Sequence, residues 1–327
     1  MKAIVYTKYG SPDVLEYKEV EKPAVKDNDV LVKIYAASLN AADWHLMRAD
    51  PFIARFMSGL LKPKINILGA DIAGRVEAVG RNVKEFHPGD EVFGDISACG
   101  WGGFAEYVCA TENALALKPA GLSFDEAAAV PLAAITALQA LCEKGHIQPG
   151  QKVLINGASG GVGTFAVQIA KSFGAEVTGV CSTTKSALVR SLGADHVIDY
   201  TQEDFTKNGQ HYDLIIAANG YHPITDYKRA LSPNGIYVMT GGSGAQMFQA
   251  MLHGPLISMT GSKKMGSLLM KPNKEDLIFM KELLEAGKVK PVIDRRYPLR
   301  EVADAMRYLE EGHAIGKIVI TLDAKAD

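Results

Sequence analysis

Apolar and polar positions alternate over short stretches in the first third of the chain. Residues 30–35 and 76–79 are two such stretches, and turns such as the one at residues 88–90 separate them. Alternation interrupted by glycine and proline is typical of β-strands that bury one face. The pattern therefore predicts a β-barrel-like domain over residues 1–122.

From residue 151 onward, short apolar runs alternate with longer stretches whose apolar residues recur at helical spacing. The runs mark the strands that we expect: 153–156, 176–180, 196–198, 214–217, 236–239 and 257–260. Strands and helices that alternate at this rhythm form a doubly wound parallel sheet. The predicted fold class is therefore α/β.

A helix is expected to lead into this sheet. Ser123 and Glu126 have the spacing of a capping box, which opens a helix over residues 123–145. Pro131 interrupts that helix, because proline has no N–H group to donate.

The end of the chain is expected to return to the first domain. Asn273 opens one helix, a second surrounds Met306, and a last strand covers residues 317–322. A chain of 327 residues exceeds the roughly 250–300 residues that share one core. The predicted domains are residues 1–122 with 292–327, and residues 123–291.

Glycines join an expected strand to an expected helix at residues 157–163. A helix that follows a strand directly presents unpaired N–H groups and its positive dipole end to the turn. The candidate phosphate-binding residues are Ser159, Gly160, Gly161, Val162 and Gly163. Ala158 stands where the strict G-x-G-x-x-G pattern has its first glycine, so a glycine turn without a ligand stays an alternative.

Composition excludes several classes of protein. The net charge is −2 and no basic patch stands out, which argues against a nucleic-acid partner. The four cysteines lack C-x-x-C spacing and we see no leader peptide, so we expect free thiols and a cytoplasmic protein. The uncharged stretch 235–262 is broken by glycines and Pro255, which predicts no membrane span.

Five motifs precede the glycine loop in the chain. They are Ser38-Leu-Asn-Ala-Ala-Asp43, residues 69–80 (GADIAGRVEAVG), residues 88–94 (PGDEVFG), residues 102–107 (GGFAEY) and residues 129–139 (AVPLAAITALQ). With these motifs and the loop, in this order, the chain resembles the medium-chain dehydrogenase/reductase superfamily, in its zinc-free quinone oxidoreductase branch. The resemblance implies a Rossmann doubly wound sheet inserted in a GroES-like β-barrel domain.

The resemblance also bears on metals. Zinc-dependent members use cysteine where this chain has Asn40 and histidine where it has Ala70. His45 and His87 are isolated from other ligands at suitable spacing, so we expect no metal. The resemblance places Asn40 and Thr136 near the nicotinamide as the catalytic candidates. The alternatives are a turn residue for Asn40 and an inter-helix hydrogen bond for Thr136.

NADPH is the expected cofactor. Sites specific for NAD place an acid about 20 residues past the glycine loop, yet residues 177–194 contain no Asp or Glu. Ser182 and Lys185 follow the second strand instead and suit a 2′-phosphate; the alternative for Lys185 is a solvated lysine at a helix start. The resemblance adds Tyr200 beside the adenine, and Asn219, Gly241 and Gly242 at the cofactor.

The expected reaction is hydride transfer from NADPH to the C=C bond of an enone or enal, or to a quinone, without zinc. The alternatives are a zinc-independent alcohol dehydrogenase and a non-catalytic NADPH-binding regulatory protein. We expect a homodimer that pairs the sheet edge at residues 257–260. Residues 44–61 are rich in methionine and aromatics, which fits a substrate pocket or ordinary core packing.

Overall fold

The computed structural model describes residues 1–52, 55, 59–242 and 244–322. The chain divides into two compact units. The N-terminal unit comprises Met1–Leu132, Pro272–Ala286 and Pro291–Asp327, and the central unit comprises Ala133–Lys271 and Gly287–Lys290. The division differs from the expected domain ranges, because the helix at 124–128 and the helix at 274–285 group with the N-terminal unit.

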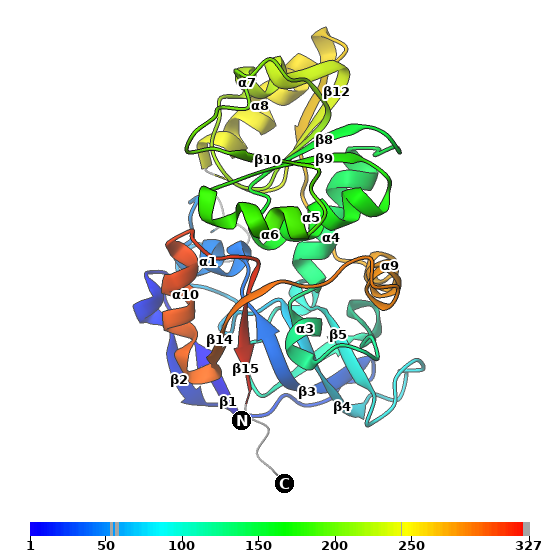
Figure 1. The fold of residues 1–327 in the computed structure, drawn as a ribbon. Coiled ribbons are helices and arrows are strands. Elements are labelled where there is room, and N and C mark those ends of the chain that lie inside the picture. The colour runs from blue at the N-terminus through cyan, green and yellow to red at the C-terminus, as the bar shows by residue number, and fades with distance from the viewer. Residues whose placement is uncertain (53–54, 56–58, 243, 323–327) are drawn as a thin grey trace. The chain divides into compact units, whose positions relative to one another are not determined.

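Strands dominate the N-terminal unit (Figure 1). They are β1 (Lys2–Val5), β2 (Glu16–Glu19), β3 (Asp29–Ser38), β4 (Asp71–Val79), β5 (Glu91–Asp95), β6 (Tyr107–Thr111), β7 (Leu115–Leu117), β14 (Ile293–Pro298) and β15 (Lys317–Thr321). Seven of them form a mainly antiparallel sheet in the order β14-β15-β3-β4-β5-β7, with β6 also paired to β3. The last strand therefore rejoins the first domain, as predicted.

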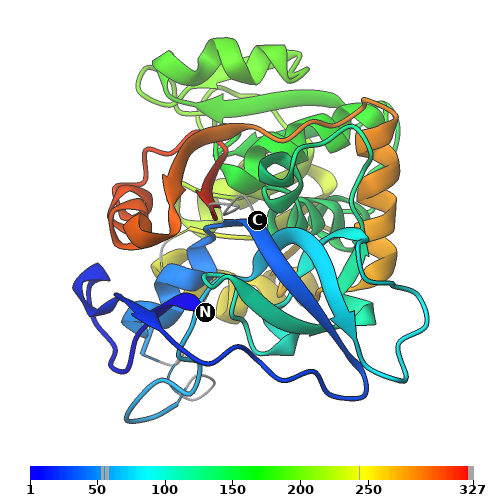
Figure 2. The ribbon, with the colours of Figure 1, turned by 90° about the horizontal axis from the view of Figure 1, so that it is seen from below.

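Among the described residues, the α-helices of this unit are α1 (Ala41–Arg48), α3 (Phe124–Ala128), α9 (Lys274–Glu285) and α10 (Val302–Glu310). Ser123 caps α3 by accepting a hydrogen bond from the N–H of Glu126, which confirms the capping box. Asn273 caps α9 in the same way, through the N–H of Asp276. Helix α9, orange in Figure 2, contacts β7.

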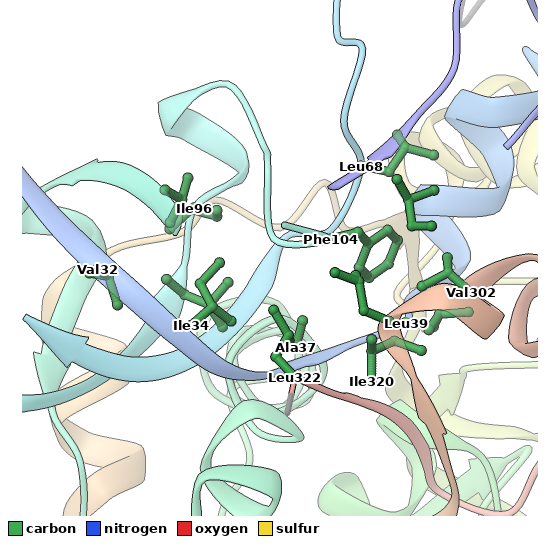
Figure 3. Packing of buried hydrophobic residues seen from close by; sticks show 14 of the residues in the cluster. Val32, Ile34, Ala37, Leu39, Leu68, Ile96, Phe104, Val302, Ile320 and Leu322 are labelled. Atoms are coloured by element: carbon green, nitrogen blue, oxygen red, sulfur yellow. The ribbon is translucent and has the colours of Figure 1, made fainter. Parts of the chain in front are cut away.

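An apolar core lies between the sheet and the helices of the N-terminal unit. Figure 3 shows Phe104 between Leu68 and Leu39, with Val302 from α10 close by. Met47 of α1 is fully buried in the same core. Of the two interpretations of residues 44–61, core packing is therefore the one that applies to Met47. Residues 53–54 and 56–58 of that stretch lie outside the described residues.

The central unit contains a six-stranded sheet in the order β10-β9-β8-β11-β12-β13, and every pair in it is parallel. Its strands are β8 (Lys152–Asn156), β9 (Glu176–Cys181), β10 (His196–Asp199), β11 (Tyr212–Ala217), β12 (Leu231–Met239) and β13 (Lys264–Ser267). Its helices are α4 (Pro131–Gln139, which starts in the N-terminal unit), α5 (Gly161–Ser172), α6 (Ser186–Ser191), α7 (Ile224–Ala230) and α8 (Gly244–Thr260). This is the doubly wound sheet that the sequence predicts.

The prediction of a strand at residues 257–260 is wrong. Residues 257–260 end helix α8, and the edge strand is β13, a few residues later. A short apolar run is compatible with a strand or with part of a helix, and the surrounding stretch lacks a clear period of either kind. The predicted interruption at Pro131 is confirmed: α3 ends at Ala128, and Pro131 is the first residue of α4, where a missing N–H group has no consequence.

Candidate active site

The turn from β8 into α5 has the geometry of a phosphate cradle. Gly157 has a φ of 84°, a conformation that residues other than glycine rarely adopt. Gly160 is the N-cap of α5, and its C=O accepts from the N–H of Thr164. The N–H groups of residues 161–163 therefore precede the first helical hydrogen bond and are available to an anion.

Gly160 and Gly163, two of the candidate phosphate-binding residues, differ in what surrounds them. A Cβ at Gly163 would lie 2.1 Å from the C=O oxygen of Gly157 and 2.8 Å from Cα of Ala158, so the helix packs against the turn there. A Cβ at Gly160 would meet only the oxygen of Gly157, at 3.6 Å. The space over Gly160 is therefore open to a ligand, and the turn fits a pyrophosphate.

Loops at the carboxyl ends of the neighbouring strands adjoin this turn. The C=O of Asn156 accepts from the N–H of Asn219 at 3.2 Å, and the C=O of Ala217 accepts from the N–H of Gly241 at 3.3 Å. Gly242, with a φ of 121°, follows directly. Ligands of parallel sheets bind at this end of the strands, so the structure brings these predicted cofactor residues to the expected edge.

The carboxyl end of β9 carries the residues assigned to the 2′-phosphate. Ser182 precedes a short 3-10 helix that ends at Lys185. The exposed Tyr200 directly follows β10, the strand that pairs with β9. The hydroxyl of Thr183 donates to the carboxylate of Asp199. Hydrogen bonds from Thr183 and Thr201 lower the pKa of Asp199, so this carboxylate is ionised at the edge of the predicted phosphate site. Sequence spacing did not reveal it, because it belongs to the next strand.

In the N-terminal unit, Asn40 lies in a buried polar cluster with Asp71 and Lys317. Its amide nitrogen donates to Oδ2 of Asp71 at 2.9 Å, and its amide oxygen accepts from the Lys317 ammonium. The ammonium also donates to Oδ2 of Asp71 at 3.2 Å. Ser38 Oγ and the N–H of Leu132 complete the donors to this carboxylate, at 3.0 Å and 2.8 Å.

The order of the strands explains how these residues meet. β3 lies between β15 and β4, and Ser38 at its end pairs with Asp71, the first residue of β4. Lys317 is the first residue of β15, and Asn40 is the N-cap of α1, two residues past β3. The side chains of Asn40, Asp71 and Lys317 therefore gather at one end of the three neighbouring strands, although they are far apart in the sequence.

Two further carboxylates are buried in the same region. Burial raises the pKa of Asp43 to about 7, although the N–H groups of Asn40 and Gly69 donate to it at 2.8 Å each and act in the opposite direction. Burial, and the charge of Asp71, raise the pKa of Asp95 to about 6. Oδ2 of Asp95 has no hydrogen-bond partner among the described residues.

Thr136 is buried in α4 and belongs to the central unit, whereas Asn40 belongs to the N-terminal unit. Within the described residues, no three His, Cys, Asp or Glu side chains are grouped so that they could hold a metal ion. The four cysteines are free thiols, as predicted.

The sequence interpretation missed Lys317 altogether and gave no role to Asp71. The sequence does carry a signal for Lys317, because a lysine opens the otherwise apolar run KIVIT. In the structure this lysine is only 3% exposed. Lysines are almost never buried this completely unless they are paired. The partner, however, is about 250 residues away in the chain, and only the sheet brings it close.

Comparisons with known proteins agree with this arrangement. The family model described as "Alcohol dehydrogenase GroES-like domain" matches residues 26–120, and the one described as "Zinc-binding dehydrogenase" matches residues 192–320. A chloroplast envelope quinone oxidoreductase homolog of Arabidopsis thaliana is 38% identical over 98% of both chains. An NADPH-dependent alkenal/one oxidoreductase of the same plant is 35% identical over 98% of this chain and 79% of its own.

A solved structure is similar over the same length. The quinone oxidoreductase from Coxiella burnetii superimposes with a TM-score of 0.88, at 32% sequence identity over 99% of both chains. The likeness therefore extends through both units of the fold.

Proposed function

Because this chain belongs to the medium-chain dehydrogenase/reductase superfamily, in its quinone oxidoreductase-like branch, we propose that it reduces the C=C bond of α,β-unsaturated carbonyl compounds, or quinones, with NADPH. It is an NAD(P)H-dependent oxidoreductase, since both relatives that it matches over nearly its whole length are named oxidoreductases and one of them is named NADPH-dependent. The preference for NADPH and the absence of zinc are the finer parts of the proposal.

The observation that carries the proposal is the set of hydrogen bonds made by the Asn40 side-chain amide. Zinc-dependent relatives are expected to have a metal ligand at this position, but the amide oxygen here accepts from an ammonium. Ala70, at the second such position, has no ligand atom. A site of this kind offers hydrogen-bond donors to a developing enolate but no Lewis acid for an alcohol, which favours conjugate reduction over alcohol dehydrogenation.

The central unit supplies the residues that would hold the cofactor. The N–H groups of residues 161–163 would bind its pyrophosphate, and Ser182 and Lys185 would bind its 2′-phosphate. Tyr200 flanks the adenine in this proposal, and Asn219, Gly241 and Gly242 line the remaining cofactor edge. When bound, NADPH supplies the hydride. Asn40 and Thr136, in their separate units, remain the residues that we propose to act beside the nicotinamide and the substrate.

Product analysis tests the reaction. Purified protein with NADPH and an enone should give the saturated ketone, and a quinone should give the hydroquinone. The protein should contain no stoichiometric zinc by elemental analysis, and chelator should leave turnover unchanged. An allylic alcohol as product, or activity lost to chelator and restored by zinc, would overturn the zinc-free reductase and favour an alcohol dehydrogenase.

We also propose a homodimer that pairs β13, which replaces residues 257–260 as the edge of the sheet. An unpaired edge strand is a template for a second copy. Helix α8, which contacts β13, exposes an apolar stripe with helical spacing: Phe248, Met251, Leu252, Leu256 and Met259. Burial of that stripe against a second copy would remove it from water.

No helix among the described residues is long and apolar enough to cross a membrane. Residence in the cytoplasm stays a proposal, since one relative above is named for the chloroplast envelope.

A further inference from the structure

The two ends of the Asn40 amide can be told apart by their partners. An ammonium group has only donors and an ionised carboxylate has only acceptors. The atom of Asn40 that contacts Lys317 must therefore be the oxygen, and the atom that contacts Asp71 must be the nitrogen. Exchange of the two atoms by rotation of the amide would put two acceptors together and two donors together.

The charges that hold the amide are deeply buried. Asp71 is fully buried, Lys317 is 3% exposed and Asn40 is 5% exposed. At such burial an ion pair is screened little by solvent, and a missing hydrogen bond leaves a charged group uncompensated. Rotation of the amide is therefore costly, and its orientation is fixed.

The fixed orientation decides what Asn40 can offer to a ligand. Its oxygen is engaged by Lys317, and its backbone N–H is engaged by the carboxylate of Asp43. The amide nitrogen carries two hydrogens, of which one points to Asp71. Within the described residues the second hydrogen has no partner, so the amide nitrogen can donate it to a ligand.

We propose that Lys317 is a positioning residue of the reduction site, which together with Asp71 locks the Asn40 amide so that it presents an N–H donor to a substrate oxygen. The inference rests on the proposed function and narrows it. The group that receives this N–H is a hydrogen-bond acceptor, namely the carbonyl oxygen of an enone or quinone, which gains negative charge as hydride adds. Lys317 does not itself contact the substrate.

The test compares three variants. Lys317→Met keeps the length of the side chain but removes the charge. The double variant Asp71→Asn with Lys317→Met removes both charges, so it leaves no unpaired buried ion and protects the test against simple misfolding. Lys118→Met is the matched control, because the side chain of Lys118 in the N-terminal unit is only 7% exposed, pairs with Glu91 at 3.2 Å and donates to the C=O of Leu122.

The expected result is a loss in kcat. Loss of a hydrogen-bond donor to the transition state lowers kcat about 100- to 1000-fold. Misorientation of the Asn40 donor should therefore lower kcat about 10- to 100-fold. The KM for the enone and the Kd for NADPH should stay within about twofold of the wild-type values. The kinetic isotope effect with NADPH deuterated at the transferred position should rise or stay at its wild-type value. Lys118→Met should keep wild-type kcat.

A second readout needs neither cofactor nor turnover. In protein labelled with ¹⁵N-asparagine, the side chain of Asn40 should give two resolved, slowly exchanging N–H signals, assigned by their loss in Asn40→Ala. In both variants without Lys317 these signals should broaden or exchange faster. This readout separates the inference from the proposed function, because it stands even if the wild type reduces no enone or quinone.

A purely structural role predicts a different result. Activity would then fall only in proportion to the folded fraction, and the Asn40 signals would be unchanged in the folded protein. That result, or wild-type kcat in the folded double variant, would overturn the positioning role of Lys317.

Discussion

Asp71 and Asp95 are directly opposite each other on the paired strands β4 and β5, and both are buried. Asp71 is surrounded by donors, whereas among the described residues Asp95 accepts only from Ser97 and its Oδ2 has no partner. The two carboxylates therefore differ in their surroundings, and burial, together with the charge of Asp71, raises the pKa of Asp95 to about 6. This difference has a consequence for stability.

Replacement of Asp95 by Asn should stabilise the protein above pH 6. A carboxyl whose folded pKa is raised binds its proton more tightly in the folded state, so the wild type loses stability as the pH rises from about 4 to about 6. The uncharged amide avoids that loss. Chemical denaturation should show Asp95→Asn to be more stable by about 1–3 kcal/mol at pH 8 and equal to the wild type at pH 4.

Asp43→Asn is the control for this prediction. Both oxygens of Asp43 accept from backbone N–H groups, and an amide has only one acceptor. Although burial also raises the pKa of Asp43 to about 7, this variant should be destabilised by about 1–3 kcal/mol, the cost of an unsatisfied buried donor. Equal behaviour of the two variants would show that hydrogen bonding does not distinguish these carboxylates.

Substitution of Lys317 and Asp71 together should destabilise the protein by much less than the sum of the two single substitutions. Each single variant leaves a buried charge without its partner, at a cost of about 3–5 kcal/mol. Urea unfolding of Lys317→Met, Asp71→Asn and the double variant should give a loss for the double variant well below the sum of the single losses. Additive losses would mean that the pair is not coupled.

Gly160→Ala and Gly163→Ala should separate cofactor binding from folding. The added Cβ at Gly160 meets no close atom, so the fold should lose at most about 1 kcal/mol as an N-cap change. NADPH should nevertheless bind at least about tenfold more weakly, because the pyrophosphate must approach that backbone. Fluorescence titration and thermal unfolding measure the two effects.

Gly163→Ala should do the reverse and lower the stability by about 3 kcal/mol, since its Cβ would lie 2.1 Å from a backbone oxygen. Unimpaired NADPH binding by Gly160→Ala would remove this turn from the proposed cofactor site.

Lys185→Ala should reduce the preference for NADPH over NADH. Loss of a charged hydrogen bond to a 2′-phosphate should lower kcat/KM for NADPH about tenfold or more and leave kcat/KM for NADH unchanged. Lys171→Ala is the matched control, because Lys171 pairs with Asp195 near the far end of α5. If the ratio of the two cofactors stays constant in Lys185→Ala, the 2′-phosphate is bound elsewhere.

The proposed dimer predicts a mass of about twice the 35.1 kDa of the chain. Multi-angle light scattering measures this mass directly. Met251→Glu with Met259→Glu places two charges in the exposed stripe of α8 and should shift the protein toward monomer, without loss of the folded state, since both side chains are exposed. A monomeric wild type would contradict the proposal.

Local patterns were sufficient for much of the fold. The apolar runs at 153–156 and 214–217 lie in central strands β8 and β11, and the caps at Ser123 and Asn273 begin helices where expected. These features depend on neighbours within a few residues, so the sequence alone predicts them. The run at 257–260 was assigned wrongly because its neighbours fit a strand and a helix equally well.

The sequence by itself determined the glycine turn, the order of strands and helices, and the presence of an amide at Asn40. Only the tertiary structure decided what that amide can do. Lys317 and Asp71 reach it because β15 and β4 flank β3, and this pairing joins residues that are 246 positions apart. The Asp199 carboxylate reaches Thr183 for the same reason, across paired strands β9 and β10. Such contacts depend on strand order and register, which no local pattern records.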